Sequence, residues 1–298
     1  MRKEHYMFVK HDVVYTGNFS LEGIDTIWVK ESFRNIVFLH GDGEELIVKE
    51  YGNSETELMR AEQRGTALCF EGNGKPLVYV GIRGIDFSSG VSVGHHKIEL
   101  TIPSDFKGQI YGESKSGDVF LEDTWELQNL QIKTASGDIN VGRIRAEHIL
   151  IESASGDICV EEAWGDRQLF SASGDICMKE GRGNLHAKTK SGDMEVGGLN
   201  AETVLESISG DIAAGFSTVT QPVKITTVSG DADIKIAADS SVNIEAKTVS
   251  GDVSVYLPLA QIISKSEKHV LAHMGSSAVE NTPVMYISSV SGDICIDD

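Results

Sequence analysis

Hydrophobic and polar residues alternate along most of the chain, and the alternation restarts after each Ser-Gly-Asp tripeptide. The residue directly after the aspartate and the residue two further on are apolar in all nine copies, whereas the position between them is mixed. This in–out–in pattern predicts a β-strand with one buried face. Two residues before the tripeptide, all nine copies have Ser or Thr. The repeated unit is therefore [ST]-x-S-G-D followed by apolar-x-apolar.

The nine tripeptides recur at a nearly constant spacing. Their glycines are Gly117, Gly137, Gly156, Gly174, Gly192, Gly210, Gly230, Gly251 and Gly292. The successive spacings are 20, 19, 18, 18, 18, 20, 21 and 41 residues, and a repeat of this length is typical of a solenoid. We expect each repeat to form one coil with a strand, a corner at Ser-Gly-Asp, a second strand and a looser second bend. Parallel coils stacked ~4.8 Å apart would bury a thin apolar core along the axis.

The recurring glycines are predicted to be structural corners, because glycine supplies a backbone geometry that a side chain would resist. The Ser/Thr column can hydrogen-bond to its own corner and to the hydroxyls of adjacent coils. The alternative fold is an antiparallel β-sandwich, which places turns every ~8–12 residues. That fold gives no reason for identical columns at a constant spacing, so the parallel β-solenoid is favoured.

The repeat pattern divides the chain into three parts. Residues 1–20 form an N-terminal segment, residues 20–110 are interpreted as irregular early β coils with a cap, and residues 110–298 carry the repeats. Gly41-Asp42 resembles a degenerate corner in the early coils. Terminal repeats are expected to be atypical because they shield the end of the core.

One segment interrupts the period inside the repeat region. Residues 258–283 are bracketed by prolines and have some helical character. We expect a loop excursion there, and excursions of this kind often carry function.

Charge restricts the partners. The 298-residue chain is 40% hydrophobic and 24% charged, with a formal net charge of −19. Such a surface repels phosphate backbones and anionic headgroups, which excludes nucleic acid and direct membrane insertion. An unknown protein, a glycan or a cationic peptide is left as the partner. Because no apolar stretch reaches the ~18 residues of a membrane span and no signal peptide is evident, a cytoplasmic location is expected, with an envelope-associated one as the alternative.

The tripeptide places one aspartate per coil on a single edge of the solenoid. We expect each of these side chains to cap its own turn by accepting backbone N–H bonds. One alternative is a calcium ladder built from Asp138, Asp157, Asp175, Asp193 and Asp211. Calcium takes about six to eight oxygen ligands, which one aspartate per coil supplies poorly. The other alternative is an acidic recognition stripe for a cationic partner.

No pattern of catalytic or cofactor-binding residues is found. The chain has no GxSxG, HExxH or phosphate-loop motif, the tandem pair His95-His96 is interpreted as a surface feature, and the arginines do not form a column. Cys159 and Cys177 occupy equivalent outward positions on successive coils and are expected to be free thiols. The sequence therefore predicts no enzyme, no catalytic residue and no cofactor.

The tandem [ST]-x-SGD-[IV]-x-[VI] units resemble the bacterial "putative adhesin" or toast-rack family. The preceding IELTIPSDFKGQIYGESKSGDVFLED is similar to that family's entry into its repeats, and IWVKESFRNIVFLHGDGEELIVKEYG to its opening. The resemblance covers residues 20–298. It implies a β-helical, non-enzymatic binding or scaffold protein that is adhesin-like and linked to the cell-envelope stress response.

Two other functions remain open. One is a calcium-loaded solenoid, and the other is a self-assembling structural protein whose coils join end to end in a filament. The chain ends at SGDICIDD, which predicts an uncapped last coil whose free edge could template pairing. The acidic residues Asp297 and Asp298 would oppose that pairing.

Overall fold

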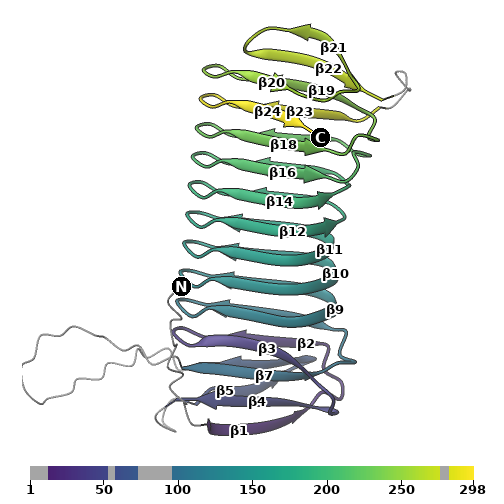
Figure 1. Cartoon of the computed structure of the whole chain (residues 1–298). Coiled ribbons are helices and arrows are strands. Elements are labelled where there is room, and N and C mark those ends of the chain that lie inside the picture. The colour runs from purple at the N-terminus through teal and green to yellow at the C-terminus, as the bar shows by residue number, and fades with distance from the viewer. Residues whose placement is uncertain (1–12, 53–57, 73–95, 276–281) are drawn as a thin grey trace, which may run out of the picture.

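The protein is an all-β stack of coils in a single column (Figure 1). The computed structural model describes residues 13–52, 58–72, 96–275 and 282–298. These residues form 24 strands that are joined in one hydrogen-bonded sheet system, and none of them is helical.

Parallel coils in register make up the middle of the stack. Three long strands each run from one corner around the second bend to the next corner, namely β9 (Val119–Thr134), β10 (Ile139–Ser153) and β11 (Ile158–Ser171). In the following coils the strand is divided at the second bend, giving β12 (Ile176–Arg182), β13 (Leu185–Lys188), β14 (Met194–Leu199), β15 (Thr203–Glu206), β16 (Ile212–Phe216), β17 (Val223–Thr226) and β18 (Ala232–Ile236). The residue after the corner aspartate pairs with its equivalent in the next coil, as Ile139 does with Ile158 and Ile158 with Ile176. The predicted parallel β-solenoid is confirmed.

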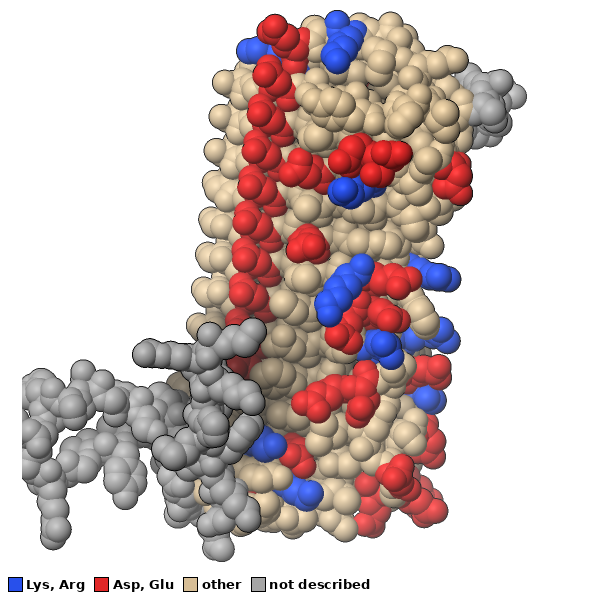
Figure 2. Space-filling model, viewed as in Figure 1, with Lys and Arg blue, Asp and Glu red and all other residues tan. Residues whose placement is uncertain are grey.

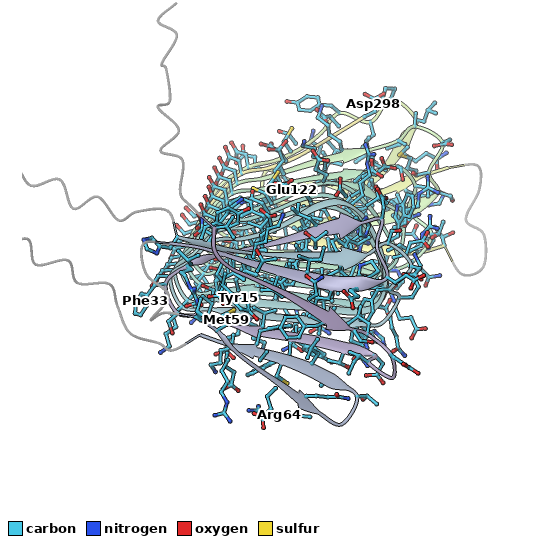
Figure 3. All side chains as sticks on the ribbon, turned by 90° about the horizontal axis from the view of Figure 1, so that it is seen from below. Tyr15, Phe33, Met59, Arg64, Glu122 and Asp298 are labelled. Carbon is cyan, nitrogen blue, oxygen red and sulfur yellow. The ribbon has the colours of Figure 1, made fainter. Side chains whose placement is uncertain are left out.

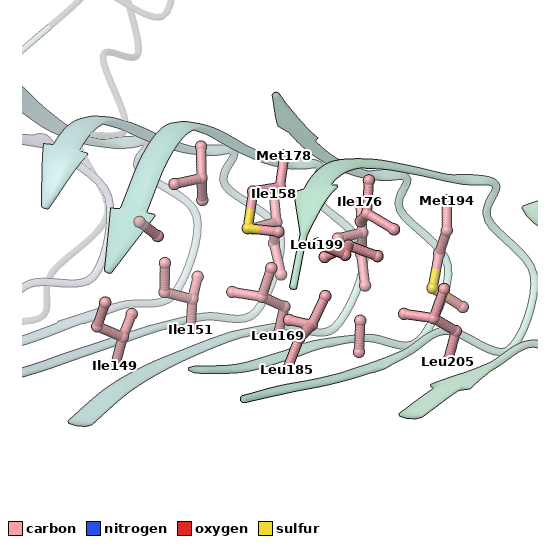
Figure 4. Close-up of a cluster of buried hydrophobic side chains, with 14 of the residues drawn as sticks. Ile149, Ile151, Ile158, Leu169, Ile176, Met178, Leu185, Met194, Leu199 and Leu205 are labelled. Carbon is pink, nitrogen blue, oxygen red and sulfur yellow. The ribbon is translucent and has the colours of Figure 1, made fainter. Parts of the chain in front are cut away.

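The core is one thin layer of aliphatic side chains that runs along the axis. Ile151, Leu169 and Leu205 line one side of it and are completely buried (Figure 4). Across the core, Ile158 and Met178 come from the strands that follow the corner. Each such side chain contributes about 1.5–3 kcal/mol when it is fully buried, and each contacts the equivalent residues of the coils above and below.

At the N-terminal end the order of coils in space differs from their order along the chain. The strands there are β1 (Val13–Ser20), β2 (Thr26–Lys30), β3 (Asn35–Gly41), β4 (Glu45–Tyr51), β5 (Arg60–Arg64), β6 (Ala67–Glu71), β7 (Lys97–Pro103) and β8 (Gln109–Ser114). The coil β2–β3 lies between β8–β9 on one side and β6–β7 on the other, with parallel pairing to both. The antiparallel strands β4 and β1 then close this end of the stack.

The first corner lies at residues 31–34 and not at Gly41-Asp42. The Arg34 carbonyl lies directly beneath Gly117, as the corner glycines do in later coils. A buried ion-pair cluster replaces the tripeptide here, since the Arg34 guanidinium binds Glu31 at 2.7 Å and Glu50 at 2.6 Å. Gly41 ends β3 and begins the connection to β4 instead. Figure 3 looks along the stack from this end, and Phe33 marks the edge at which the corners turn.

At the C-terminal end the last coil of the sequence is inserted between two earlier ones. The remaining strands are β19 (Val242–Lys247), β20 (Val253–Val255), β21 (Ala260–Lys265), β22 (His269–Met274), β23 (Val284–Ser288) and β24 (Ile294–Asp297). Strand β23 pairs with β17 and β19, and β24 pairs with β18 and β20. The chain therefore completes the coil β19–β20 first and then returns to fill the place beneath it (Figure 1).

This arrangement corrects two expectations. Within the segment 258–283, the described strands β21 and β22 form an antiparallel hairpin, and β22 pairs antiparallel with β19. The helical character expected for this segment is therefore wrong for its described residues. The last coil is not an open end, because β24 has parallel partners on both sides. The open end on which the filament hypothesis relied is therefore absent there, and the stack is closed by the hairpin.

Candidate functional site

The corner edge of the solenoid is held by hydrogen bonds from the Ser/Thr column. The Ser171 hydroxyl accepts a 2.8 Å bond from the backbone N–H of Gly174, three residues later, and Ser153 does the same for Gly156. The Thr134 hydroxyl donates to the Gly137 carbonyl at 2.7 Å, and its oxygen is also within hydrogen-bonding distance of Ser153 Oγ at 3.1 Å. These column residues therefore bind their own corner and link adjacent coils, as the sequence predicts, whereas the buried Ser207 Oγ has no hydrogen-bond partner.

The corner glycines stack directly on one another. A Cβ atom on any of the nine would lie 2.0–2.3 Å from the carbonyl oxygen of the corner beneath it. None of the nine has a positive φ, since the glycines with φ in that region, such as Gly183 and Gly198, lie elsewhere. Glycine is thus needed here for the close approach of two coils and not for an unusual local backbone conformation.

The corner aspartates form a continuous ladder of hydrogen bonds between coils. In each coil, Oδ1 of the aspartate accepts the backbone N–H of the aspartate in the next coil, at 2.7–3.0 Å. The row runs in space through Asp118, Asp138, Asp157, Asp175, Asp193, Asp211, Asp231, Asp293 and Asp252. At its lower end Asn35 takes the same role and accepts the N–H of Asp118 at 2.9 Å. Each aspartate was expected to cap its own turn, whereas it caps the turn of the neighbouring coil.

We call these nine aspartates the Asp row, and no ion pair to any of them is found among the described residues. Figure 2 shows it as an unbroken red line along one edge. Several acidic residues elsewhere have partners, and Glu206 binds both Lys188 at 3.0 Å and Lys224 at 3.3 Å. The Lys188 hydrogen bond is the main cause that lowers the pKa of Glu206. Neighbouring charges ~4.8 Å apart repel by ~1 kcal/mol in water and ~3–4 kcal/mol at a dielectric near 20.

An exposed aliphatic column lies beside the upper part of the Asp row. The residue between the Ser/Thr column and the tripeptide is Lys or Ala in the five lower coils and β-branched aliphatic in the four upper ones. In spatial order these four are Ile208, Val228, Val290 and Val249, which are 46%, 42%, 48% and 66% exposed. Successive backbone bonds, such as Ser229 N–H to the Ile208 carbonyl and Ser291 N–H to the Val228 carbonyl, place them on consecutive coils. We call these four residues the aliphatic ridge.

The second bend carries an arginine and tryptophan column that the sequence does not predict. Trp164 pairs in register with Arg145 on one side and with Arg182 on the other. The Arg145 guanidinium carbon lies 4.2 Å from the centre of the Trp164 ring. All three residues line a shallow groove of about 850 Å³. The four arginines of the repeat region do not form a single column, as expected, but Arg145 and Arg182 share one in which Trp164 lies between them.

Arg167 is buried inside the same bend without a carboxylate partner. Its side chain is 2% exposed and donates to the carbonyls of Gly183 and Asn184 and to Met178 Sδ. Burial lowers the pKa of Arg167 to about 10, so the guanidinium stays protonated at neutral pH. Gly181 provides the space, because a Cβ atom there would overlap the guanidinium.

The other residues considered in the sequence are dispersed. Cys159 and Cys177 are adjacent and in register, whereas Cys295 lies between Asp233 and Ser254 in another part of the same column. His95 lies outside the described residues, and His96 is buried, so the interpretation of this pair as a surface feature is wrong for His96. Across residues 13–52, 58–72, 96–275 and 282–298, no group of three or more His, Cys, Asp or Glu side chains is arranged to hold a metal ion. In the described part of the chain no helix is long and apolar enough to cross a membrane.

Comparison with known proteins gives the family. The sequence profile of Toastrack DUF4097 matches residues 24–202 and again residues 188–297. The chain belongs to the toast-rack family. The nine corners of this toast-rack protein lie within the matched ranges, so the resemblance inferred from the repeats is confirmed. No curated protein sequence matches the chain.

Two solved structures are similar to this toast-rack protein over most of their length. A "putative adhesin" from Bacteroides fragilis is 15% identical, with 95% of each chain covered and a TM-score of 0.48. A "putative cell adhesion protein" from Clostridium sporogenes is 11% identical, with 95% of this chain and 97% of the other covered and a TM-score of 0.28.

The aliphatic ridge is the part of the corner edge that sequence reasoning missed. Its signal was present in the sequence, since the position before each tripeptide changes from Lys or Ala to Ile or Val after residue 207. The alternation along the strands does not predict whether the side chain at that position is buried or exposed, because the position lies in the corner and not in a strand. Only the corner geometry shows that it points outward beside the Asp row.

Proposed function

We propose that this protein is a non-enzymatic, adhesin-like binding module whose corner edge binds a basic, partly apolar segment of another protein. The observation that carries the proposal is the position of the aliphatic ridge beside the upper part of the Asp row. Row and ridge are built on consecutive coils of a rigid stack, so both surfaces are fixed before a partner arrives.

Charge complementarity decides the kind of partner. Several acidic residues of the strand faces are paired with lysine or arginine, as Glu206 is with Lys188 and Lys224. The Asp row has no such balance, and its Oδ2 atoms do not take part in the ladder. A linear array of uncompensated carboxylates attracts cationic surfaces and speeds their association.

The aliphatic ridge restricts the partner further. Four large aliphatic side chains in a continuous line form a patch of the kind that marks protein contacts. A small cation would engage the Asp row and leave this patch uncovered. A basic segment that also has apolar side chains would cover both, and we therefore favour it over a glycan or a metal ion.

Two finer parts of the proposal rest on the family resemblance. These are a position at the cell envelope and a link to the envelope stress response. Fractionation of cells that produce the tagged protein tests the position, since a purely cytoplasmic signal contradicts an envelope role and leaves the binding proposal to be judged by the next experiment.

Fluorescence anisotropy with a short labelled peptide of alternating lysine and valine tests the binding proposal. A ridge variant replaces Val228 and Val290 by the isosteric Thr, and a row variant replaces Asp231 and Asp293 by Asn, which keeps the ladder acceptor as Asn35 does. We expect each variant to bind about tenfold more weakly, which corresponds to ~1.4 kcal/mol. Binding should also weaken in ~0.5 M salt because exposed charges are then screened.

The matched control replaces Ala135 and Ala154 by Thr in the same column of the lower coils. This control should bind the peptide like the unmodified protein. Equal affinity of the ridge variant, the row variant and the control, or no binding at all, would contradict the proposal.

A further inference from the structure

A pair of thiols lies side by side on the strand face that follows the corner. Cys159 in β11 and Cys177 in β12 are paired in register on adjacent parallel strands, and both point outward. Both cysteines are free. Parallel neighbours in a sheet lie ~4.8 Å apart, and in-register side chains that project in parallel from two such strands keep this spacing.

That separation is poorly suited to a disulfide. A disulfide needs Cβ atoms ~3.5–4.5 Å apart and an S–S bond of ~2.05 Å. The coils cannot approach each other at this point, because the corner glycines Gly156 and Gly174 already touch through their backbones. The Asp157–Asp175 ladder bond of 2.8 Å fixes the same two coils.

The separation matches a metal ion placed between the two sulfurs. Two metal–thiolate bonds of ~2.3 Å laid in line span ~4.6 Å. Thiolates select soft ions such as Cu(I), which accepts two thiolates in a linear arrangement. Ions that need four or more ligands do not fit this site. The next side chains in the same column, Asn140 below and Glu195 above, continue the line at the coil spacing and do not converge on one point with the two thiols.

We propose that Cys159 and Cys177 form a two-coordinate site for a soft monovalent metal ion, with Cu(I) as the biological candidate. Binding breaks two S–H bonds, forms two S–Cu bonds and releases two protons to solvent, and copper remains Cu(I). Burial, followed by the effects of Cys177 and Asp157, raises the pKa of the Cys159 thiol, so this thiol carries a proton that the metal must displace at neutral pH.

The surroundings allow access to the site. The two cysteines line an open groove of about 480 Å³ together with Phe120 and Asn140. The ion pair between Lys179 and Glu161, at 3.2 Å, lies at the same groove. A donor complex could therefore approach both thiols from one side and transfer Cu(I) by ligand exchange.

Cys295 provides a matched control within the chain. It occupies the same column and faces outward in the same way, but its neighbours in register are Asp233 and Ser254. A single thiol at this position lacks the second soft ligand, so it should not bind Cu(I) with comparable affinity.

Competition of the anaerobic, reduced full chain with bicinchoninate for Cu(I) tests the proposal. The unmodified protein and Cys295→Ser should each bind one Cu(I) per chain with the same affinity. Cys159→Ser and Cys177→Ser should each bind at least a hundredfold more weakly, and Cys159→Ala provides a second variant if the serine is poorly tolerated. Melting curves establish that all variants are folded.

Three results would overturn the site. One is no Cu(I) binding by the unmodified protein, and another is undiminished binding by the Cys159 and Cys177 variants. The third is a disulfide between residues 159 and 177 after mild oxidation, mapped by non-reducing peptide mass spectrometry, because it would show that the sulfurs reach bonding distance.

Discussion

The backbone N–H of Asp293 donates a 2.7 Å hydrogen bond to Oδ1 of Asp231, although 62 residues separate the two along the chain. Asp252 lies between them in sequence but on the far side of Asp293 in space. Its backbone N–H donates a 2.9 Å hydrogen bond to Asp293 Oδ1. The Asp row is therefore continuous in space but not in sequence. Coils are interchangeable at this edge because each presents the same donor and acceptor.

Crosslinking of engineered cysteines tests the inserted coil. In a background without the native cysteines, Val228→Cys with Val290→Cys should react with a thiol crosslinker that spans one coil spacing. Val228→Cys with Val249→Cys should not, because a whole coil lies between these positions. Intramolecular crosslinking is measured by intact mass, and the opposite preference would mean that the coils stack in sequence order.

Gly174→Ala tests the close stacking of corners. The new Cβ would lie 2.1 Å from the Gly156 carbonyl oxygen, and only separation of the two coils removes this overlap. We expect a loss of about 3 kcal/mol in the free energy of unfolding, at the upper end for overpacked sites, measured by urea denaturation. Gly43→Ala is the control, since no atom lies within 4 Å of its Cβ position, and an equal effect of both variants would refute the steric explanation.

Two substitutions of Asp175 separate its charge from its hydrogen bond. Asp175→Ala leaves the Asp193 N–H without its acceptor, and this should cost about 1–3 kcal/mol. Asp175→Asn keeps the acceptor, as Asn35 does at the lower end, and removes repulsion within the row. It should therefore raise the melting temperature at low salt, with a gain that fades in ~1 M salt, and a destabilised Asn variant would show that the row is not under repulsion.

Arg167 gives a prediction for alkaline pH. Its folded-state pKa of about 10 lies well below the ordinary value for arginine, so the buried charge lowers stability at neutral pH. This loss amounts to about 3 kcal/mol at ~1.4 kcal/mol per pKa unit, and it is relieved as the pH rises through 10. The stability of the natural protein relative to Arg167→Met should therefore increase between pH 8 and pH 10.5 in urea titrations, and a constant difference would argue against a depressed pKa.

Removal of divalent metal distinguishes the two interpretations of the aspartates. In the hydrogen-bonded ladder Oδ1 is already occupied by an N–H in every coil that has a neighbour above it. EDTA should therefore leave the melting temperature unchanged, as recorded by circular dichroism. A lower melting temperature in EDTA that calcium restores would support the calcium-loaded solenoid instead.

The sequence predicts the coil but not the order in which coils stack. Spacing and columns identify the strands on both sides of each corner, because burial on one face imposes a period of two. The place of Gly292 between Gly230 and Gly251 could not be deduced, since equivalent coils fit any neighbour equally well and the spacing of 41 residues is compatible with either order. The hairpin from Ala260 to Met274 was also missed, because β21 is exposed on both faces and shows no alternation.

The surface chemistry was predicted only in part. The Asp row follows directly from the tripeptide, but the acceptor role of its carboxylates toward the next coil depends on corner geometry that no pattern encodes. The sequence suggested that glycine is needed for the backbone conformation of its own corner. In the structure it is needed because a side chain would collide with the corner of the neighbouring coil. The neighbouring thiols of Cys159 and Cys177 were expected from their equal positions in successive repeats, and the structure places them in register.

The inserted coil also determines how the protein responds to mechanical load. Strand β24 is hydrogen-bonded along both edges, to β18 and to β20. A pulling force on Asp298 along the strand would act on two rows of bonds at once and in shear, rather than peeling a terminal strand one bond at a time. A tether attached at this point would be fastened to the interior of the stack.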